Sequence, residues 1–289
     1  WGYNYYGQLG DGTTTQRNTP TALSGWPSGR TAVALAAGNS HTCSILDDGS
    51  VRCWGYNWYG QLGDGTAGNT NRNTPTALSG WPSGRTAVAL AGGGTHTCAI
   101  LDDGSVRCWG RNNWGGLGDG TTTDRHTQKL VSVPLNTPAL AGGGYEHTCA
   151  ILDDGSVRCW GNNGNGQLGD GTTTDRNTPT ALSGWPSGRT AVALAAGYYH
   201  TCAILDDGSV RCWGWNNQGQ LGDGTTTSRT TPTALSGWPS GRTAVALAGG
   251  GYHTCAILDD GSVRCWGSNS VGQLGDGTNT DRNTPQLVS

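Results

Sequence analysis

Histidine and cysteine recur together in this chain, and they are its residue types best suited to chemistry. One fourteen-residue segment reads His-Thr-Cys-Ala-Ile-Leu-Asp-Asp-Gly-Ser-Val-Arg-Cys-Trp in its commonest form. It occurs five times, starting at His41, His96, His147, His200 and His253. Its two cysteines could form a disulfide, or they could bind a zinc ion together with the histidine. Each segment offers only three such ligands and no Cys-x-x-Cys pair, so the pattern favours the disulfide.

The same segment has the pattern of a β-hairpin. Apolar and β-branched residues alternate on either side of Asp-Asp-Gly, which is typical of a three-residue loop ending in a left-handed glycine. This loop places Leu205 opposite Ser209. The alternation then makes Cys202 and Cys212 a non-hydrogen-bonded pair, with Cα atoms ~4.5 Å apart. We therefore predict five disulfides: Cys43–Cys53, Cys98–Cys108, Cys149–Cys159, Cys202–Cys212 and Cys255–Cys265.

The composition excludes several classes of protein. The 289 residues suffice for one large β domain, and 51 glycines with 34% hydrophobic residues argue against a helical bundle. The net charge of −3 gives no reason to expect a nucleic-acid partner. No apolar run approaches the ~20 residues that a membrane-spanning helix needs. Paired cysteines indicate an oxidising compartment, so we expect an extracellular, secreted or cell-surface protein.

Self-similarity indicates the architecture. Trp-Gly pairs start at Trp1, Trp54, Trp109, Trp160, Trp213 and Trp266, and each leads into a Gly-Gln-Leu-Gly-Asp-Gly stretch, in which Gly replaces Gln once. Each period offers four short strands: an Ala-rich inner strand, the two hairpin strands, and a strand after a proline that suits an outer edge because proline donates no hydrogen bond. Four-stranded antiparallel sheets repeated around an axis form a β-propeller.

The repeated sequence motif also resembles that of a known family. Gly-Ser-Val-Arg-Cys-Trp-Gly-x-Asn-x-x-Gly-Gln-Leu-Gly-Asp-Gly, then Pro, an Ala-Gly-rich strand and His-Thr, is similar to the regulator of chromosome condensation (RCC1-like) repeat over essentially the whole chain. The resemblance implies an all-β propeller, usually of seven blades. We predict one domain, residues 1–289, with complete blades at about 31–79, 86–133, 137–183, 190–236 and 243–289.

Residues 1–23 are expected to form an N-terminal half-blade, comprising the end of a third strand and a fourth strand. The chain starts inside a repeat, so we expect a processed chain or a fragment. Three alternatives remain for the closure of the ring. Either further blades are missing from this sequence, or the ring closes irregularly, or a neighbouring chain completes it.

Two short stretches vary between otherwise similar repeats: the residues after Trp-Gly and those before the repeated histidine. Strand direction places both at one end of the propeller, called here the variable end, and the Asp-Asp-Gly turns at the other, the turn end. The variable stretches are rich in residue types that anchor protein interfaces. We predict a recognition face made of Tyr3, Tyr5, Tyr6, Tyr56, Trp58, Tyr59, Arg111, Trp114, Tyr145, Tyr198, Tyr199, Trp215 and Tyr252. Ordinary exposed loops under weak constraint are the alternative.

Catalysis is not expected, because near-identical blades offer the same groups five times instead of one unique site. Each repeated histidine is predicted to fill a contact between blades. We expect no cofactor and no metal, although the Asp-Gly-Thr loops could bind calcium weakly where they are not simply turns. One repeat is irregular between His126 and Leu140, where the usual Ser-Gly-Trp-Pro-Ser-Gly-Arg stretch is replaced. This stretch contains the chain's only lysine, Lys129, and the only glutamate, Glu146, is nearby in the sequence.

The resemblance extends to function. Family members include a nuclear exchange factor for a small GTPase, a plant ultraviolet photoreceptor and a secreted bacterial β-lactamase inhibitor, which all work through a propeller surface. We predict a non-enzymatic extracellular propeller that serves as a protein-interaction or structural scaffold and binds a protein or glycan. One alternative is a subunit of an extracellular filament that joins copies of itself through the half-blade. Another is a regulator similar to a guanine-nucleotide exchange factor.

Overall fold

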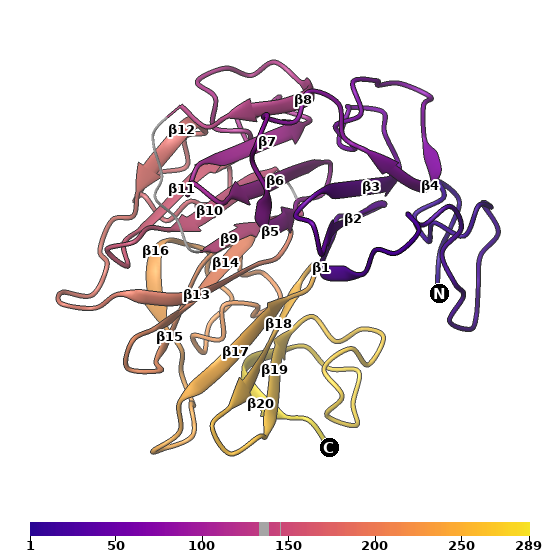
Figure 1. The fold of residues 1–289 in the computed structure, drawn as a ribbon. Coiled ribbons are helices and arrows are strands. Elements are labelled where there is room, and N and C mark those ends of the chain that lie inside the picture. The colour runs from indigo at the N-terminus through magenta and orange to yellow at the C-terminus, as the bar shows by residue number, and fades with distance from the viewer. Residues whose placement is uncertain (133–138, 145) are drawn as a thin grey trace.

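The structure is a computed structural model that describes residues 1–132, 139–144 and 146–289. Within these ranges the chain forms five four-stranded antiparallel sheets and no helix. The sheets are arranged radially, as Figure 1 shows. No helix in the described ranges is long and apolar enough to cross a membrane. The predicted all-β propeller of four-stranded blades is confirmed.

The strands of each blade are hydrogen-bonded in sequence order. Blade 1 contains β1 (Ala32–Ala37), β2 (His41–Leu46), β3 (Val51–Gly55) and β4 (Arg72–Ala77). Blade 2 contains β5 (Ala87–Gly92), β6 (His96–Leu101), β7 (Val106–Gly110) and β8 (Arg125–Leu130). Blade 3 contains β9 (Ala139–Gly142), β10 (His147–Ile151), β11 (Val157–Gly161) and β12 (Arg176–Ala181). Blade 4 contains β13 (Ala191–Ala196), β14 (His200–Leu205), β15 (Val210–Gly214) and β16 (Arg229–Ala234). Blade 5 contains β17 (Ala244–Gly249), β18 (His253–Leu258), β19 (Val263–Gly267) and β20 (Arg282–Leu287).

The Ala-rich first strand of each blade lies at the axis, as predicted. Contacts lead from β1 to β5, β9, β13 and β17 in turn, and no comparable contact among these described strands leads from β17 back to β1. Small residues are needed here because the backbones approach closely: a Cβ atom added to Gly92 would lie 2.5 Å from the carbonyl oxygen of Ala37. Figure 1 shows the opening between the N-terminal half-blade and blade 5. The way in which the ring closes stays a prediction.

The hydrophobic core lies between successive blades. Cys202, Ile204 and Val210 of blade 4 are buried against the neighbouring face of blade 5. Blade 5 contributes Ala256, Leu258 and Trp266 to this cluster: Cys202, Ile204, Val210, Cys212, Leu221, Ala244, Ala256, Leu258 and Trp266. The hairpins of blades 2, 3 and 4 therefore contribute one face to the blade before them and the other to the blade after them, and are buried on both sides, whereas Ile257 in the hairpin of blade 5 is 44% exposed.

Each hairpin has the predicted register and disulfide. Cys202 pairs with Cys212 and the Leu205 N–H donates to the Ser209 carbonyl at 2.9 Å. All five predicted disulfides are present, each with a Cα–Cα distance of 4.1 Å: Cys43–Cys53, Cys98–Cys108, Cys149–Cys159, Cys202–Cys212 and Cys255–Cys265. The zinc alternative is wrong, because both sulfur atoms of each hairpin are bonded to each other and neither is a thiolate.

The outer strand differs from the prediction that it would start after its proline. β12 starts at Arg176 and contains Pro179 in its middle. The register of the β11–β12 pair shifts between Cys159 and Gly161, so Pro179 has no Cα partner in β11. β12 is also the edge strand of its sheet, where a missing N–H costs no ladder hydrogen bond.

The N-terminal half-blade contains less regular structure than predicted. In place of a fourth strand it has one isolated bridge between Gly2 and Arg17. In blade 1 the equivalent bridge, Gly55 to Arg72, is extended by pairs from earlier residues of β3. The described structure holds no counterparts of Arg52 and Cys53 beside the half-blade, so its pairing is limited to this one bridge.

Candidate functional site

The two variable stretches of each blade lie side by side. The Tyr56 N–H donates to the Ser40 carbonyl at 2.8 Å, and the Trp215 N–H donates to the Tyr199 carbonyl at 2.9 Å. Equivalent bonds join the two stretches in the other blades. The residues after Trp-Gly and those before the histidine therefore share one end of the propeller, as the strand directions predict.

The repeated histidines cross-link neighbouring blades beneath this end. His200 Nε2 lies 2.9 Å from Thr254 Oγ1, and the Thr254 hydroxyl donates to the Gln220 carbonyl at 3.0 Å. A hydroxyl has one hydrogen, so Thr254 accepts from His200 and the proton is on Nε2. The same histidine–threonine contact occurs at His41–Thr97, His96–Thr148 and His147–Thr201. The predicted role of the repeated histidines in contacts between blades is confirmed for His41, His96, His147 and His200.

These histidines are neutral at physiological pH. Burial lowers the pKa of His200 to about 3, and repulsion from His253 adds to the shift. Burial also lowers the pKa of His96 to about 4. The Nδ1 atoms of both rings are buried without a hydrogen-bond partner. Protonation would therefore place a charged N–H against groups that cannot accept it.

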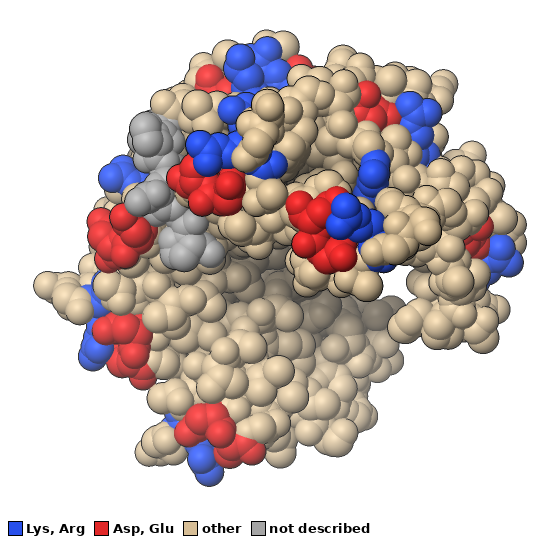
Figure 2. All heavy atoms as spheres, viewed as in Figure 1, with Lys and Arg blue, Asp and Glu red and all other residues tan. Residues whose placement is uncertain are grey.

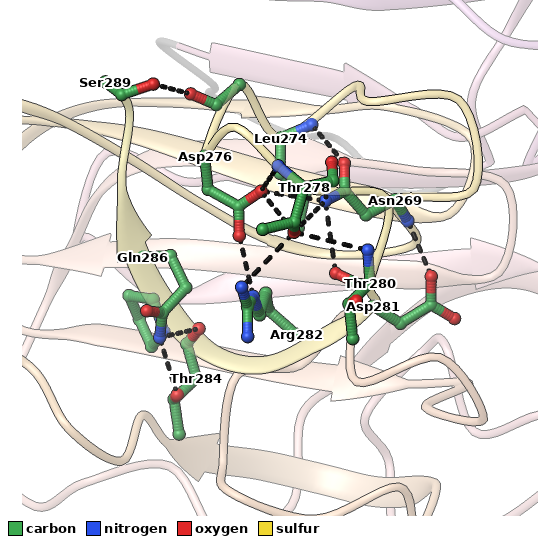
Figure 3. A network of polar contacts seen from close by, with 12 residues as sticks. Asn269, Leu274, Asp276, Thr278, Thr280, Asp281, Arg282, Thr284, Gln286 and Ser289 are labelled. Atoms are coloured by element: carbon green, nitrogen blue, oxygen red, sulfur yellow. Dashed lines mark hydrogen bonds and ion pairs between the residues drawn. The ribbon is translucent and has the colours of Figure 1, made fainter.

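A buried asparagine holds the variable stretch that follows each Trp-Gly pair (Figure 3). In blade 5, Asn269 Oδ1 accepts the Leu274 N–H at 2.9 Å. Asn269 Nδ2 lies 3.0 Å from Asp276 Oδ1, 2.9 Å from the Thr278 carbonyl and 3.1 Å from the Thr280 carbonyl. Asparagines in the other loops occupy the same position and are fully buried: Asn4, Asn57, Asn112, Asn163 and Asn216. Sequence reasoning missed this network, although the invariant asparagine among variable neighbours was a signal for it.

An ion pair completes each network. Arg282 Nε lies 2.7 Å from Asp276 Oδ2, and Arg17 Nε lies 2.7 Å from Asp11 Oδ2. The hydrogen bond from the Thr13 side chain is the largest cause that lowers the pKa of Asp11, to about 2, and Arg17 adds to it. The oxygens that a calcium ion would need are thus already bonded to an amide nitrogen and a guanidinium. The Asp-Gly-Thr loops that the structure describes have no free oxygen set for the calcium alternative.

The variable side chains surround this fixed asparagine. The residue before it and the two after it differ from blade to blade, while the asparagine itself is constant. Several of the flanking side chains reach solvent: Tyr3 is 56% exposed, Tyr5 67%, Trp58 47% and Trp114 39%. Each loop is therefore a rigid frame that presents three exchangeable positions.

Six of the predicted site residues form one group, the N-terminal aromatic cluster: Tyr3, Tyr5, Tyr6, Tyr56, Tyr59 and Arg111. The Tyr6 and Tyr56 rings have centroids 4.6 Å apart and join the half-blade to blade 1. The guanidinium carbon of Arg111 lies 4.7 Å from the Tyr59 ring centroid and extends the cluster to blade 2.

Four other predicted residues form the C-terminal aromatic cluster: Tyr198, Tyr199, Trp215 and Tyr252. The Trp215 and Tyr252 centroids lie 5.2 Å apart, and those of Tyr198 and Tyr252 lie 5.3 Å apart. The structure thus separates ten residues of the predicted face into two clusters, and it leaves Trp58 and Trp114 exposed. Tyr145 lies outside the described residues.

A cavity of about 350 Å³ opens beside the C-terminal aromatic cluster at the axis. Tyr198 and Asn39 line it together with glycines of the inner strands and the loops that follow them. The Tyr198 N–H donates to the Gly251 carbonyl at 3.0 Å, so backbone bonds between blades frame the cavity. A Cβ atom on Gly144 would lie 2.0 Å from the Tyr198 ring, so this glycine provides the space that the ring occupies.

Glu146 forms a buried ion pair that sequence reasoning missed. Its Oε1 lies 2.8 Å from Arg111 Nη1 and accepts the Thr95 hydroxyl at 3.1 Å. Its Oε2 is buried without a hydrogen-bond partner, and burial raises the pKa of Glu146 while Arg111 opposes the shift. The partner is Arg111 and not Lys129, which lies opposite Cys108 in blade 2.

An extra residue explains the position of Glu146. The stretch before His147 is one residue longer than in the other blades, and Glu146 has φ of 62°, the only positive value for a non-glycine residue in the described part of the chain. A side chain at Gly116 would meet the Glu146 carbonyl at 2.8 Å. The insertion therefore accounts for glycine replacing the usual glutamine at position 116.

The turn end is polar and charged. Arg189 Nη2 lies 3.0 Å from Asp207 Oδ2, and equivalent pairs join Arg30, Arg85 and Arg242 to the turns of their blades. Figure 2 shows acidic and basic side chains gathered in small mixed patches, with uncharged surface between them. The charges at the turns of blades 1, 2, 4 and 5 thus largely neutralise one another.

Comparison with known proteins matches the whole chain, residues 1–289, to the family described as RCC1-like domain. The ultraviolet-B receptor UVR8 of Arabidopsis thaliana is 31% identical over 289 residues, which are all of this chain and 64% of that protein. The E3 ubiquitin-protein ligase HERC2 of Homo sapiens is 30% identical over 292 residues, which are only 6% of its length. The chain thus spans less than two thirds of these relatives.

Solved structures agree on the fold. Human WBSCR16 has a TM-score of 0.87 and 23% identity, and the match covers 100% of this chain and 75% of that one. Yeast RCC1 (Prp20), solved bound to Kap60, has a TM-score of 0.78 and 22% identity, and the match covers 90% of this chain and 62% of that one. With the family match over residues 1–289, these likenesses show that the chain belongs to the RCC1-like domain family of β-propellers.

Proposed function

We propose that this chain is a non-enzymatic, extracellular propeller that binds a protein partner through its variable end. One observation carries the proposal. The buried asparagine network is constant from blade to blade, while the side chains that it presents differ and are rich in Tyr, Trp and Arg. Rigid loops with exchangeable aromatic positions are the arrangement by which paratopes bind proteins.

Two further facts support the proposal. The yeast protein Prp20 is described as binding Kap60, Gsp1p and histones, so a propeller of this family can be a protein-binding surface. The ten cysteines are paired in disulfides, which persist in oxidising compartments and supply the argument for an extracellular location. Four of the five repeated histidines are taken up by hydrogen bonds to threonines of neighbouring blades.

The test compares substitutions at the two ends of the propeller. Trp58→Ala with Trp114→Ala removes exposed rings of the variable end, whereas Val88→Ala with Val192→Ala removes exposed apolar groups beside the Asp-Asp-Gly turns. Proteins captured from a secreted fraction by the wild type should be retained by the valine variant and lost from the tryptophan variant. Equal retention by both variants would contradict the proposal.

Light scattering on the same samples separates partner binding from self-assembly. A single monomeric species is the result that the recognition proposal predicts, because it excludes assembly of the chain with its own copies. Fibres or a broad distribution of sizes would favour the filament alternative.

A further inference from the structure

The axis of the propeller is the one place where all five blades can contact a single small ligand. The inner strands β1, β5, β9, β13 and β17 converge there, as Figure 1 shows. A cavity of about 350 Å³ opens at the variable end of these strands. Glycine and alanine supply all of its described lining except Asn39 and Tyr198. A site made of repeated residues would occur once per blade, whereas a site at the axis combines different residues from all five.

One position beside the cavity differs among the blades. The second residue after each inner strand is Asn39 in blade 1, Tyr198 in blade 4 and glycine in the other three. A Cβ atom on Gly144 would lie 2.0 Å from one edge of the Tyr198 ring, and a Cβ atom on Gly251 would lie 3.1 Å from the opposite edge. The ring therefore extends from blade 3 to blade 5, and the glycines leave it room.

Backbone hydrogen bonds between blades hold this wall in place. The Asn39 N–H donates to the Gly94 carbonyl at 3.3 Å, and the Tyr198 N–H donates to the Gly251 carbonyl at 3.0 Å. The equivalent N–H of blade 5, on Gly251, has no hydrogen-bond acceptor within residues 1–132, 139–144 and 146–289. The cavity is thus preorganised, and Gly251 offers it an unpaired donor.

The polar groups of the cavity favour an uncharged ligand with hydroxyl groups. No described residue of the lining is acidic or basic, so a charged ligand would lose its hydration without gaining a counter-charge. The Asn39 amide and the Tyr198 hydroxyl each donate and accept hydrogen bonds, and neither is hydrogen-bonded to another described residue. A ligand hydroxyl also donates and accepts, so it can satisfy both groups.

The Tyr198 ring and the size of the cavity favour one sugar residue. An aromatic wall suits a ligand that has an apolar face beside its polar groups. A pyranose of the β-gluco configuration carries all its substituents equatorially, so both of its faces consist of C–H groups and its hydroxyls lie on the rim. The volume of about 350 Å³ is at the small end of the range of about 300–1,000 Å³ for ligand sites.

We propose that the axial cavity binds one neutral pyranose residue of the β-gluco configuration. One face of the sugar stacks on the Tyr198 ring, and its hydroxyls bond to the Asn39 amide and the Gly251 N–H. This inference goes beyond the proposed function, because it names a second class of ligand and a site that Trp58 and Trp114 do not line.

The probe is methyl β-D-glucopyranoside, observed by saturation-transfer difference NMR. Transfer should be strongest for the protons of one ring face, either H1, H3 and H5 or H2 and H4. Tyr198→Ala should weaken binding at least about fivefold, whereas Tyr198→Phe, which keeps the ring, should retain most of it. Asn39→Trp, at an exposed position, should fill the cavity and abolish binding. Trp215→Ala is the matched control, because Trp215 belongs to the same aromatic cluster but does not line the cavity.

Two further sugars test the shape and the charge of the site. Methyl α-D-mannopyranoside has an axial substituent on each face, so it should bind more weakly than the glucoside. The methyl β-glucuronide differs from the glucoside by a carboxylate, and it should also bind more weakly because the cavity offers no counter-charge.

Three results would overturn the inference: no transfer to the glucoside with the wild type, equal transfer with Tyr198→Ala, or stronger binding of the mannoside or the glucuronide. Circular dichroism and the melting temperature confirm that each variant is folded. The assay needs no partner protein, so it can fail while Trp58 and Trp114 still prove necessary for partner capture. Conversely, the sugar can bind when no partner is captured, and the two proposals are therefore tested separately.

Discussion

Single residues decide which parts of each loop are fixed. Asn269 accepts the Leu274 N–H and shares its two amide hydrogens among three oxygens of its own loop, so its replacement would leave buried polar groups without partners. The Glu146–Arg111 pair is the exception to this repetition, since it occurs in one blade and requires an inserted residue. A buried carboxylate with one unpartnered oxygen at a left-handed residue is costly, which marks this position for direct measurement.

Glu146 can be titrated by itself, because it is the only glutamate in the chain. Labelling with [5-¹³C]glutamate should give one carboxyl resonance, and its midpoint should lie above the ordinary 4.5 because burial disfavours the charged form. Arg111→Gln should raise the midpoint further by removing the opposing positive charge. With a raised pKa, the contribution of this group to stability is present at low pH and is lost as pH rises through the folded value. A midpoint at or below 4.5 would contradict the buried geometry.

At the scale of strands and hairpins, the histidine–threonine contacts make stability depend on pH. Burial lowers the folded pKa of four histidines from the ordinary 6.5 to about 3 or about 4: His41, His96, His147 and His200. Below pH 6.5 the unfolded chain therefore binds protons that the folded chain does not. The contribution of these histidines to the free energy of unfolding is fully present above that pH. It decreases as pH falls, by up to about 1.4 kcal/mol per pH unit for each histidine.

Denaturant unfolding between pH 7 and pH 5 measures this effect. The free energy of unfolding should decrease over this interval, and His200→Gln should reduce the slope by about one proton. The aspartates of the loop network do not interfere, because the pKa of Asp11 is about 2 and its contribution is lost only at much lower pH. A free energy of unfolding that stays constant from pH 7 to pH 5 would contradict the buried, neutral histidines.

The hairpins show how much of an element can be predicted from sequence. The Asp-Asp-Gly turn fixes the register, so the cross-strand cysteine pair follows from local chemistry alone. The start of the outer strand does not follow from local chemistry, because the register shift between Cys159 and Gly161 depends on how β12 pairs with β11. The strand expected in the half-blade was also wrong, since an isolated bridge between Gly2 and Arg17 takes its place, and the sequence of residues 1–23 alone does not show how far such pairing extends.

At the scale of the whole molecule, comparison of the blades distinguishes a constant structural frame from a variable surface. The frame consists of disulfide-linked hairpins, histidine contacts between blades and asparagine networks, and it recurs with little change. The surface is the variable end. The sequence predicted which residues lie at this end, but not which of their side chains contact one another. Their division into two clusters depends on rings from different blades meeting, as Tyr6 and Tyr56 do, and no local pattern specifies such a contact.

Exchange of one blade's variable residues for another's tests this separation most directly. Blade 5 carries Ser268, Ser270 and Val271 around its asparagine, and these types can replace the aromatic positions of blade 1 by Tyr56→Ser, Trp58→Ser and Tyr59→Val. We predict that the exchanged protein keeps its five disulfides and its cooperative unfolding, loses at most a few degrees of melting temperature, and no longer binds its partner. Unchanged partner binding by this folded variant would contradict the assignment of recognition to the variable end.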